Sequence, residues 1–357
     1  MKVILYDIDS KIPNLALMKL SSYYKNKGYK TLLSKKPIFI PGDLYFASVV
    51  FNSKKSLDLV NRLTKYYGDK ITIGGTGVDL NTRLNEEVDC QFPDYSLYAH
   101  TKYALGFLTR GCNKRCEFCV VPKKEGHLQP NYSTFDDFIP KDQKNVMLLD
   151  NSLLAAPNTT DLLKEIAKRQ YNVNFSQTLD IQHLTDEIYQ TLINVKSVNS
   201  RFTRKMIYFS CNTVKQTEWF NAKSDQLRGF GKGQVTAVIM FGFNTRLSQD
   251  FTILKMMRKL GVIPFVQEYQ PIPGVSARIP EDYFDMNLDE LTEFRIRTNG
   301  QNGEKFLRYV SNLYFNRHGR YYLPMLQAIY RYNNKQRLQY YLDRPELLSV
   351  DMYKKYL

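Results

Sequence analysis

The strongest constraint on the fold is a regular alternation of short apolar runs with longer segments of helical periodicity. Residues 3–6 form an apolar run, and residues 15–27 carry apolar side chains at helical spacing before Gly28, a common helix terminator. The same order then returns, with strand patterns at 30–33, 45–51 and 71–73 and a helical pattern at 56–67. Alternating strands and helices form parallel sheets. We therefore expect a doubly wound α/β domain at the start of the chain.

A second series of strand and helix patterns runs from residue 103 to residue 268. The expected strands are 103–108, 146–149, 173–176, 206–210, 234–241 and 262–268, and the expected helices are 160–169, 185–194, 218–226 and 249–260. About six strand–helix repeats predict a partial or complete (β/α) barrel.

Residues 89–103 lack periodicity and contain Pro93, so we interpret them as the linker between the two series. The predicted domains are an α/β domain at 1–95, a barrel at 96–280 and a helical extension at 281–357. The extension is basic and rich in tyrosine, with helical spacing at 306–315 and 324–332. Basic and aromatic residues together bind single-stranded nucleic acid. The same tyrosines also suit a helical cap whose rings pack inward, so both interpretations stay open.

The charge balance indicates a class of partner. The chain has 50 Lys and Arg residues against 35 Asp and Glu residues, a net charge of +15. Basic proteins often bind polyanions, so a nucleic acid or a nucleotide is the first substrate to expect. A lysine-rich composition that only keeps the protein soluble is the alternative. We expect no membrane partner, since no run of about 18 apolar residues is present, and the first residues resemble a strand rather than a signal peptide.

Cysteine usage predicts a cytoplasmic metal or cluster protein. Of the five cysteines, three crowd into residues 112–119, which makes a poor disulfide framework. Cys112, Cys116 and Cys119 form a CxxxCxxC loop just after an expected strand. Three thiolates at this spacing can hold three irons of a [4Fe–4S] cluster and leave the fourth iron open to a small molecule. Structural zinc or a closed cluster would need a further ligand, for which the candidates are Cys90, Cys211 and His127.

The loop resembles that of the radical S-adenosylmethionine superfamily. In that superfamily CxxxCxxC follows the first barrel strand and an aromatic residue precedes the third cysteine, as Phe118 does here. The run from Cys116 to Pro122 is similar to the branch with tRNA methylthiotransferases and cobalamin-associated enzymes. The resemblance implies that S-adenosylmethionine binds the open iron. One electron from flavodoxin or ferredoxin then breaks its carbon–sulfur bond to give a 5′-deoxyadenosyl radical, which takes a hydrogen atom from the substrate.

Segments after the loop extend the resemblance as far as residue 273. By this resemblance the cofactor-binding residues are Phe118, Asp150, Asn151, Gln177, Asp180, Gly242 and Asn244. Asp150 and Asn151 follow the second barrel strand, where the superfamily meets the methionine amino group, and Gly242 and Asn244 follow the fifth, which meets the adenine. Ordinary strand-end turns or helix caps are the alternative for these polar residues. The sequence singles out no catalytic residue and predicts no oligomeric state.

The first domain resembles the cobalamin-binding-like domain that precedes many such barrels. The run from Gly74 to Gly77 follows a strand pattern and would permit close backbone approach to a ligand. The Asp-x-His-x-x-Gly motif for cobalamin is absent, which disfavours cobalamin as a cofactor, although binding without a protein histidine stays open. Cys90 is the single cysteine of this domain, so the second cluster of the methylthiotransferases has no ligand set, which argues against sulfur insertion.

Basic residues surround the cysteine loop, namely Arg110, Lys114, Arg115, Lys123 and Lys124. They could attract an anionic cofactor, an electron-donor protein or a nucleic acid, or they could form a solvated loop. The leading hypothesis is a radical S-adenosylmethionine enzyme with an unidentified substrate. The alternatives are a cobalamin-dependent radical methyltransferase and a non-catalytic iron–sulfur protein that binds nucleic acid.

Overall fold

The computed structural model describes residues 1–36, 38–270, 272, 275, 288–292, 301–330 and 334–348, with residues 301 and 302 described by their backbone alone. The described residues fall into two compact units. The first is Met1–Tyr208 with the short segment near residue 272, and the second is Phe209–Tyr269 with the described residues beyond 277. The predicted domain boundaries at 95 and 280 stay a prediction. The division between the units lies within a strand, after Tyr208.

The first unit begins with a four-stranded parallel sheet in the order β2-β1-β3-β4. Its strands are β1 (Lys2–Asp7), β2 (Lys30–Ser34), β3 (Leu44–Ser48) and β4 (Ile71–Gly74). Its helices are α1 (Leu15–Asn26), α2 (Lys54–Tyr67) and the short α3 (Glu86–Asp89). All four strands and the two long helices lie where the apolar pattern predicts them.

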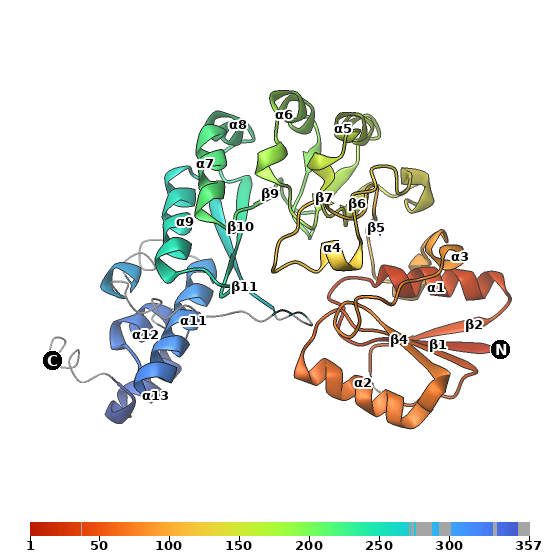
Figure 1. Cartoon of the computed structure of the whole chain (residues 1–357), viewed down its shortest axis with the longest axis horizontal. Helices are drawn as coiled ribbons and strands as arrows, with labels where there is room; N and C mark the ends of the chain where they lie inside the picture. Colours follow the sequence, from red (N-terminus) through yellow and green to blue (C-terminus); the bar gives the residue numbers. More distant parts are fainter. Residues whose placement is uncertain are drawn as a thin grey trace. The chain divides into compact units, whose positions relative to one another are not determined.

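Helices α1 and α2 cover opposite faces of this sheet, as Figure 1 shows. Successive side chains of a strand point to opposite faces. In β1, Val3 and Leu5 accordingly pack with Leu17 of α1, whereas Ile4 and Tyr6 pack with the residues of α2. Full burial of an aliphatic side chain of this size contributes about 1.5–3 kcal/mol. This two-sided core is the reason for the doubly wound arrangement.

A second four-stranded parallel sheet follows in the first unit, in the order β5-β6-β7-β8. Its strands are β5 (Ala104–Gly106), β6 (Asn145–Leu148), β7 (Asn172–Phe175) and β8 (Lys196–Ser197). Its helices are α4 (Val121–Lys124), α5 (Thr159–Lys168) and α6 (Asp186–Leu192). Met18 of α1 packs in one apolar cluster with Leu105, Met147 and Leu149, and this cluster joins the second sheet to the helix that covers the first sheet.

The second unit contains a three-stranded sheet in the order β11-β10-β9 and a group of helices. The strands are β9 (Ile207–Ser210), within which the division between the units falls, β10 (Val235–Phe241) and β11 (Ile263–Glu268). The helices are α7 (Val214–Ala222), α8 (Ser224–Gly229), α9 (Leu247–Lys259), α11 (Gln301–His318), α12 (Leu323–Tyr330) and α13 (Lys335–Leu342). Short 3₁₀ turns lie at Gly68–Lys70, Tyr95–Tyr98, Phe135–Asp137, Leu153–Ala155, Ile181–His183 and Pro345–Leu347.

The strands expected to form a partial or complete barrel lie in two sheets in the described residues, and the barrel stays a prediction. Two helix expectations differ from the structure. The single helix expected at 218–226 is two helices, α7 and α8, separated at Lys223. The extension contains α11, α12 and α13 and also helical backbone at 288–292, where two helical segments were expected. No helix in the described residues combines the length and the apolar character that crossing a membrane requires.

Candidate functional site

The candidate site is the cysteine loop that follows β5. Strand β5 ends at Gly106, where a Cβ atom would lie 2.4 Å from the ring of Phe138, so only glycine fits there. The chain then turns at Leu108 and Thr109, whose backbone N–H groups both donate to the carboxylate of Asp150. The Thr109 hydroxyl donates to the same carboxylate at 2.8 Å. Asp150 thus fixes the start of the loop from the end of the neighbouring strand β6.

The Asp150 carboxyl is fully buried, and its pKa reflects two opposing effects. Burial raises the pKa of Asp150 to about 6, while the hydrogen bonds from Thr109 and Leu108 act in the opposite direction. Both carboxylate oxygens accept hydrogen bonds from the protein. Asp150 is therefore already committed to the backbone of the loop, and its expected contact with a cofactor stays a prediction.

Gly111 is the point at which the loop needs glycine. Its φ angle is +84°, and a Cβ atom there would lie 2.3 Å from the carbonyl oxygen of His127. The backbone N–H of Gly111 donates to Oδ1 of Asn151 at 3.1 Å. Within the described residues, the side-chain NH₂ of Asn151 has no hydrogen-bond partner. Asn151 therefore anchors the residue just before the first cysteine and keeps its donors available.

The loop is closed by the segment that returns from α4. Arg110 and Gln129 form an antiparallel bridge, with N···O distances of 3.1 and 2.7 Å. The N–H of Cys112 donates to the carbonyl of Gly126 at 3.1 Å, and Oδ1 of Asn113 accepts from the N–H of Leu128 at 3.1 Å. The single segment 126–129 thus holds the chain on both sides of the first cysteine through these hydrogen bonds.

The three cysteines of the loop are partly buried free thiols. The N–H of Cys119 donates to the carbonyl of Cys116 at 3.0 Å, and the N–H of Lys114 approaches Sγ of Cys112 at 3.4 Å. Burial raises the pKa of the Cys116 and Cys119 thiols, and repulsion from Cys112 raises both further.

The donor set of the loop fits an iron–sulfur cluster better than a hard metal ion. Three thiolates from one loop are the ligands that hold such clusters, and their soft sulfur disfavours magnesium or calcium. Within the described parts of the chain, no three side chains of His, Cys, Asp or Glu converge on a metal position. The three cysteines therefore share one loop, and their side chains form no preformed metal geometry among the described residues.

Asp180 also lies beside the cysteine loop. Its carboxylate pairs with Lys114, which stands between the first two cysteines, and Nε2 of His183 lies 3.8 Å from the same oxygen. Asp180 caps the 3₁₀ turn Ile181–His183 by accepting from the N–H of Gln182. Phe118 is half-buried in the loop, and Gln177 is exposed in the turn after β7. The predicted contact of either residue with a cofactor stays a prediction.

Gly242 and Asn244 belong to the second unit, where they follow β10. Both have positive φ angles, of +83° and +53°, and Asn tolerates this conformation better than most residues do. A Cβ atom on Gly242 would lie 2.7 Å from the hydroxyl of Tyr309. The glycine therefore permits close packing against α11, and the predicted contact of either residue with adenine stays a prediction.

Two of the basic residues around the loop have structural roles that sequence reasoning missed. Arg110 pairs with Asp89 at 3.0 Å and with Glu125 at 2.5 Å, and it also contacts the hydroxyl of Tyr132. Lys124 is 8% exposed, and its Nζ donates to backbone carbonyl oxygens near residue 80. Neither residue belongs to a solvated loop or is free to attract a partner. Only tertiary contacts could have shown this, because the sequence gives no signal for pairing over such distances.

The glycine run after β4 approaches the chain itself. A Cβ atom on Gly75 would lie 2.1 Å from the carbonyl oxygen of Val49, and one on Gly77 would lie 2.7 Å from the backbone of Phe51. The N–H of Gly77 donates to the carbonyl of Val49 at 3.0 Å. The close approach that the sequence suggested for a ligand is therefore made by the segment between β3 and α2.

Comparisons with known proteins give a limited likeness. No family model and no curated protein matches the chain. A structure of SuiB from Streptococcus suis bound to S-adenosylmethionine is similar over 74% of this chain and 60% of that chain, with 11% identity and a TM-score of 0.36. A spore photoproduct lyase variant with bound AdoMet and dinucleoside spore photoproduct is similar over 75% of this chain and 78% of that chain, with 11% identity and a TM-score of 0.31.

This chain thus spans about 60% of the length of the SuiB chain that it matches. Likeness of this extent establishes no family. What the molecule itself establishes is a mixed α/β architecture built on parallel sheets, with three free cysteines in a glycine-anchored loop at the carboxyl end of β5.

Proposed function

We propose that this protein is a radical S-adenosylmethionine enzyme that holds a [4Fe–4S] cluster through Cys112, Cys116 and Cys119. The observation that carries the proposal is the cysteine loop itself. Three free thiols lie within eight residues, directly after a parallel strand, on a loop that Gly111 and Asn151 anchor. Active sites of α/β proteins lie at this carboxyl edge of the sheet.

The chain supplies positioning, and the cofactor supplies the chemistry. When bound, a cluster with one open iron provides the electron that cleaves S-adenosylmethionine into methionine and a 5′-deoxyadenosyl radical. Asp150 and Asn151 hold the loop in the conformation that presents the thiols, through Leu108, Thr109 and Gly111. The free NH₂ of Asn151 is a donor that a carboxylate or carbonyl oxygen of a bound cofactor would accept.

The finer assignments are part of this proposal. They comprise a cobalamin-binding-like domain at 1–95, a radical S-adenosylmethionine barrel at 96–280, and cofactor contacts from Phe118, Gln177, Asp180, Gly242 and Asn244. The pairing of Asp180 with Lys114, which stands between the first two cysteines in the loop, supports its assignment. Flavodoxin or ferredoxin is the proposed electron donor, and a nucleic acid or nucleotide is the proposed substrate because of the +15 charge.

The test is anaerobic reconstitution with iron and sulfide, followed by S-adenosylmethionine and dithionite, with 5′-deoxyadenosine measured by mass spectrometry. The variants are Cys116→Ala and, as a matched control, Cys90→Ala, which removes an exposed cysteine outside the loop. We expect about four irons per chain and 5′-deoxyadenosine from the wild type and Cys90→Ala, with both lost in Cys116→Ala.

Two outcomes would contradict the proposal. Equal iron content in Cys116→Ala and the wild type would show that the loop is not the cluster site. A full cluster without 5′-deoxyadenosine, together with salt-sensitive RNA binding, would favour a non-catalytic cluster protein instead. A tightly bound coloured corrinoid after purification would favour the cobalamin-dependent methyltransferase.

A further inference from the structure

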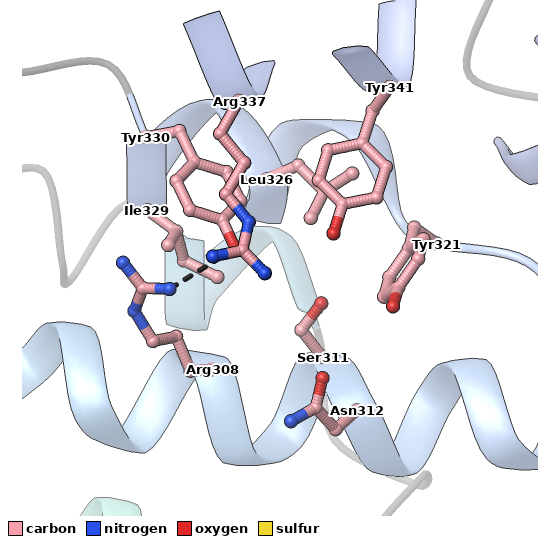
Figure 2. A pocket seen from close by; sticks show the side chains of 9 residues that line it. All are labelled: Arg308, Ser311, Asn312, Tyr321, Leu326, Ile329, Tyr330, Arg337 and Tyr341. Carbon is pink, nitrogen blue, oxygen red and sulfur yellow. Dashed lines mark hydrogen bonds between the residues drawn. The ribbon is translucent and has the colours of Figure 1, made fainter. Parts of the chain in front are cut away.

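The C-terminal helices line a small polar cavity, open to solvent on one side, that the proposed function does not use. Its volume is about 130 Å³. Apolar cavities of about 150 Å³ take up a molecule of benzene, so this one has room for a small group. The lining residues, shown in Figure 2, are Arg308, Ser311, Asn312, Tyr321, Leu326, Ile329, Tyr330, Arg337 and Tyr341.

Helix α11 supplies one wall of the cavity. Arg308, Ser311 and Asn312 are spaced three and four residues apart, so their side chains share one face of the helix. Ser311 is 2% exposed, and its Oγ has no hydrogen-bond partner in the described protein. Figure 2 shows this Oγ directed into the cavity. A buried hydroxyl without a partner is costly, and a bound acceptor would remove that cost.

Two arginines bring positive charge to the same space. Arg308 pairs with the buried Glu304, with Nε 3.0 Å from Oε1, and its Nη1 donates to the Tyr330 hydroxyl at 3.1 Å. Arg337 reaches in from α13 (Figure 2) and forms no ion pair within the described residues. The two guanidinium carbons lie 4.8 and 5.7 Å from the Tyr330 ring centre. Arg337, an exposed residue, is therefore the arginine without a carboxylate partner among the described residues.

The remaining polar groups of the cavity are mainly hydroxyls that can donate. Burial raises the pKa of the Tyr321 and Tyr330 phenols, so both stay protonated at neutral pH. Tyr341 adds a third phenol to the lining. No carboxylate is among the lining residues. The cavity therefore presents donors from several directions around a net positive charge.

We propose that this cavity binds a phosphate group through Arg337, Arg308 and Ser311. A phosphate offers several acceptor oxygens in a tetrahedral arrangement, which suits donors that converge from different helices, and guanidinium groups bind it strongly. A planar carboxylate would leave part of this donor set unused. The cavity shares no residue with the cysteine loop, so the proposal does not depend on the proposed enzyme activity.

The same chemistry serves the phosphate of a free nucleotide and the terminal phosphate of a nucleic acid, and the test distinguishes them. The full-length protein is titrated at constant ionic strength with inorganic phosphate, AMP, and one RNA oligonucleotide in 5′-phosphorylated and 5′-hydroxyl forms. Heat is measured by calorimetry. The variants are Arg337→Gln and Ser311→Ala. Arg320→Gln is the matched control, because Arg320 is exposed and absent from the lining.

We expect saturable binding of inorganic phosphate that weakens about 10–100-fold in Arg337→Gln and about 3–10-fold in Ser311→Ala, and stays unchanged in Arg320→Gln. Tighter binding of AMP than of inorganic phosphate assigns the site to nucleotides. A gain in affinity on 5′-phosphorylation of the oligonucleotide assigns it to nucleic-acid ends.

Ser311→Ala provides a second readout, because removing an unpartnered buried hydroxyl should leave thermal stability unchanged or raise it while phosphate binding falls. A variant that loses phosphate binding because it is unfolded would instead show a lower melting temperature. Absence of saturable phosphate binding by the wild type, or equal affinity in Arg337→Gln and Arg320→Gln, would overturn the proposal.

Discussion

Asn151 accepts a hydrogen bond from the backbone N–H of Gly111, and this bond ties the end of β6 to the residue that precedes the first cysteine. The neighbouring Asp150 accepts from Leu108 and Thr109 in the same way. Two consecutive polar residues at one strand end therefore set the path of the loop that follows the adjacent strand. Because parallel strands end at the same edge of a sheet, this support needs only a short reach.

Replacement of Gly111 should disrupt the cysteine loop. In Gly111→Ala the new Cβ would meet the His127 carbonyl at 2.3 Å in a backbone conformation that alanine avoids, so the loop must shift. We expect a loss of about 2–4 kcal/mol in the free energy of unfolding and reduced iron content after reconstitution. Urea denaturation and iron analysis measure the two effects.

Gly126→Ala is the matched control for that variant. Gly126 also has a positive φ, of +76°, but a Cβ atom there meets nothing within 4 Å. This variant should therefore cost about 1 kcal/mol from backbone strain alone and keep its iron. An equal effect of the two substitutions would contradict the steric role of Gly111.

Asp150 should make stability depend on pH. Its pKa is raised to about 6 in the folded protein, against about 3.9 in an unfolded chain. The folded protein thus binds the proton more tightly. The contribution of Asp150 protonation to the free energy of unfolding is fully present below pH 4 and is lost as the pH rises to about 6. The free energy of unfolding should fall by about 2–3 kcal/mol over this range.

Asp150→Asn should flatten this dependence, because the amide does not titrate. Urea denaturation between pH 4 and pH 7.5 measures the effect, with the exposed Asp142→Asn as control. The amide also keeps one oxygen as an acceptor but presents an NH₂ to backbone donors, so the variant should be less stable at low pH by about 1–3 kcal/mol. An unchanged pH profile in Asp150→Asn would count against the raised pKa.

Arg110 should contribute more to stability than a comparable surface arginine. Arg110→Lys keeps the charge but loses the forked contact with Asp89 and Glu125, which lie 27% and 16% exposed. We expect a loss of about 2–4 kcal/mol in the free energy of unfolding, since the pair is largely shielded from water. Arg169→Lys, at the more exposed pairing with Asp136 and Glu165, should cost about 0.5–1 kcal/mol. Equal losses would show that the Arg110 network behaves as a surface ion pair.

Alkylation of the cluster-free protein should rank the cysteines by exposure and thiolate content. Cys90 is exposed and should react fastest with iodoacetamide. Cys211 is buried, and burial raises its pKa to about 12, so it should react slowest. Cys116 and Cys119 should lie between them, because burial raises their pKa while they stay partly accessible.

Peptide mass spectrometry over time at pH 7.5 measures these rates. After reconstitution with iron and sulfide, protection should appear at the three loop cysteines and leave Cys90 unchanged. Protection of Cys90 together with the loop would instead indicate that it contributes a ligand.

Local pattern predicted much of the secondary structure. The alternation of apolar and polar residues in β1 and the helical spacing in α1 depend on neighbours within one turn or one strand, and the structure has both elements there. The position of the cysteine loop after β5 was predicted for the same reason. The break between α7 and α8 at Lys223 was missed, because no proline or glycine marks it.

The sequence by itself therefore determined the parallel α/β layers and the grouping of three thiols, since both are written in residues close together in the chain. Tertiary structure alone decided which polar groups support them. The contacts of Asn151 with Gly111 and of Arg110 with Asp89 join residues 40 and 21 positions apart, and the C-terminal cavity collects side chains from three helices. Such pairings depend on how whole elements pack to bury apolar surface, which no local pattern records.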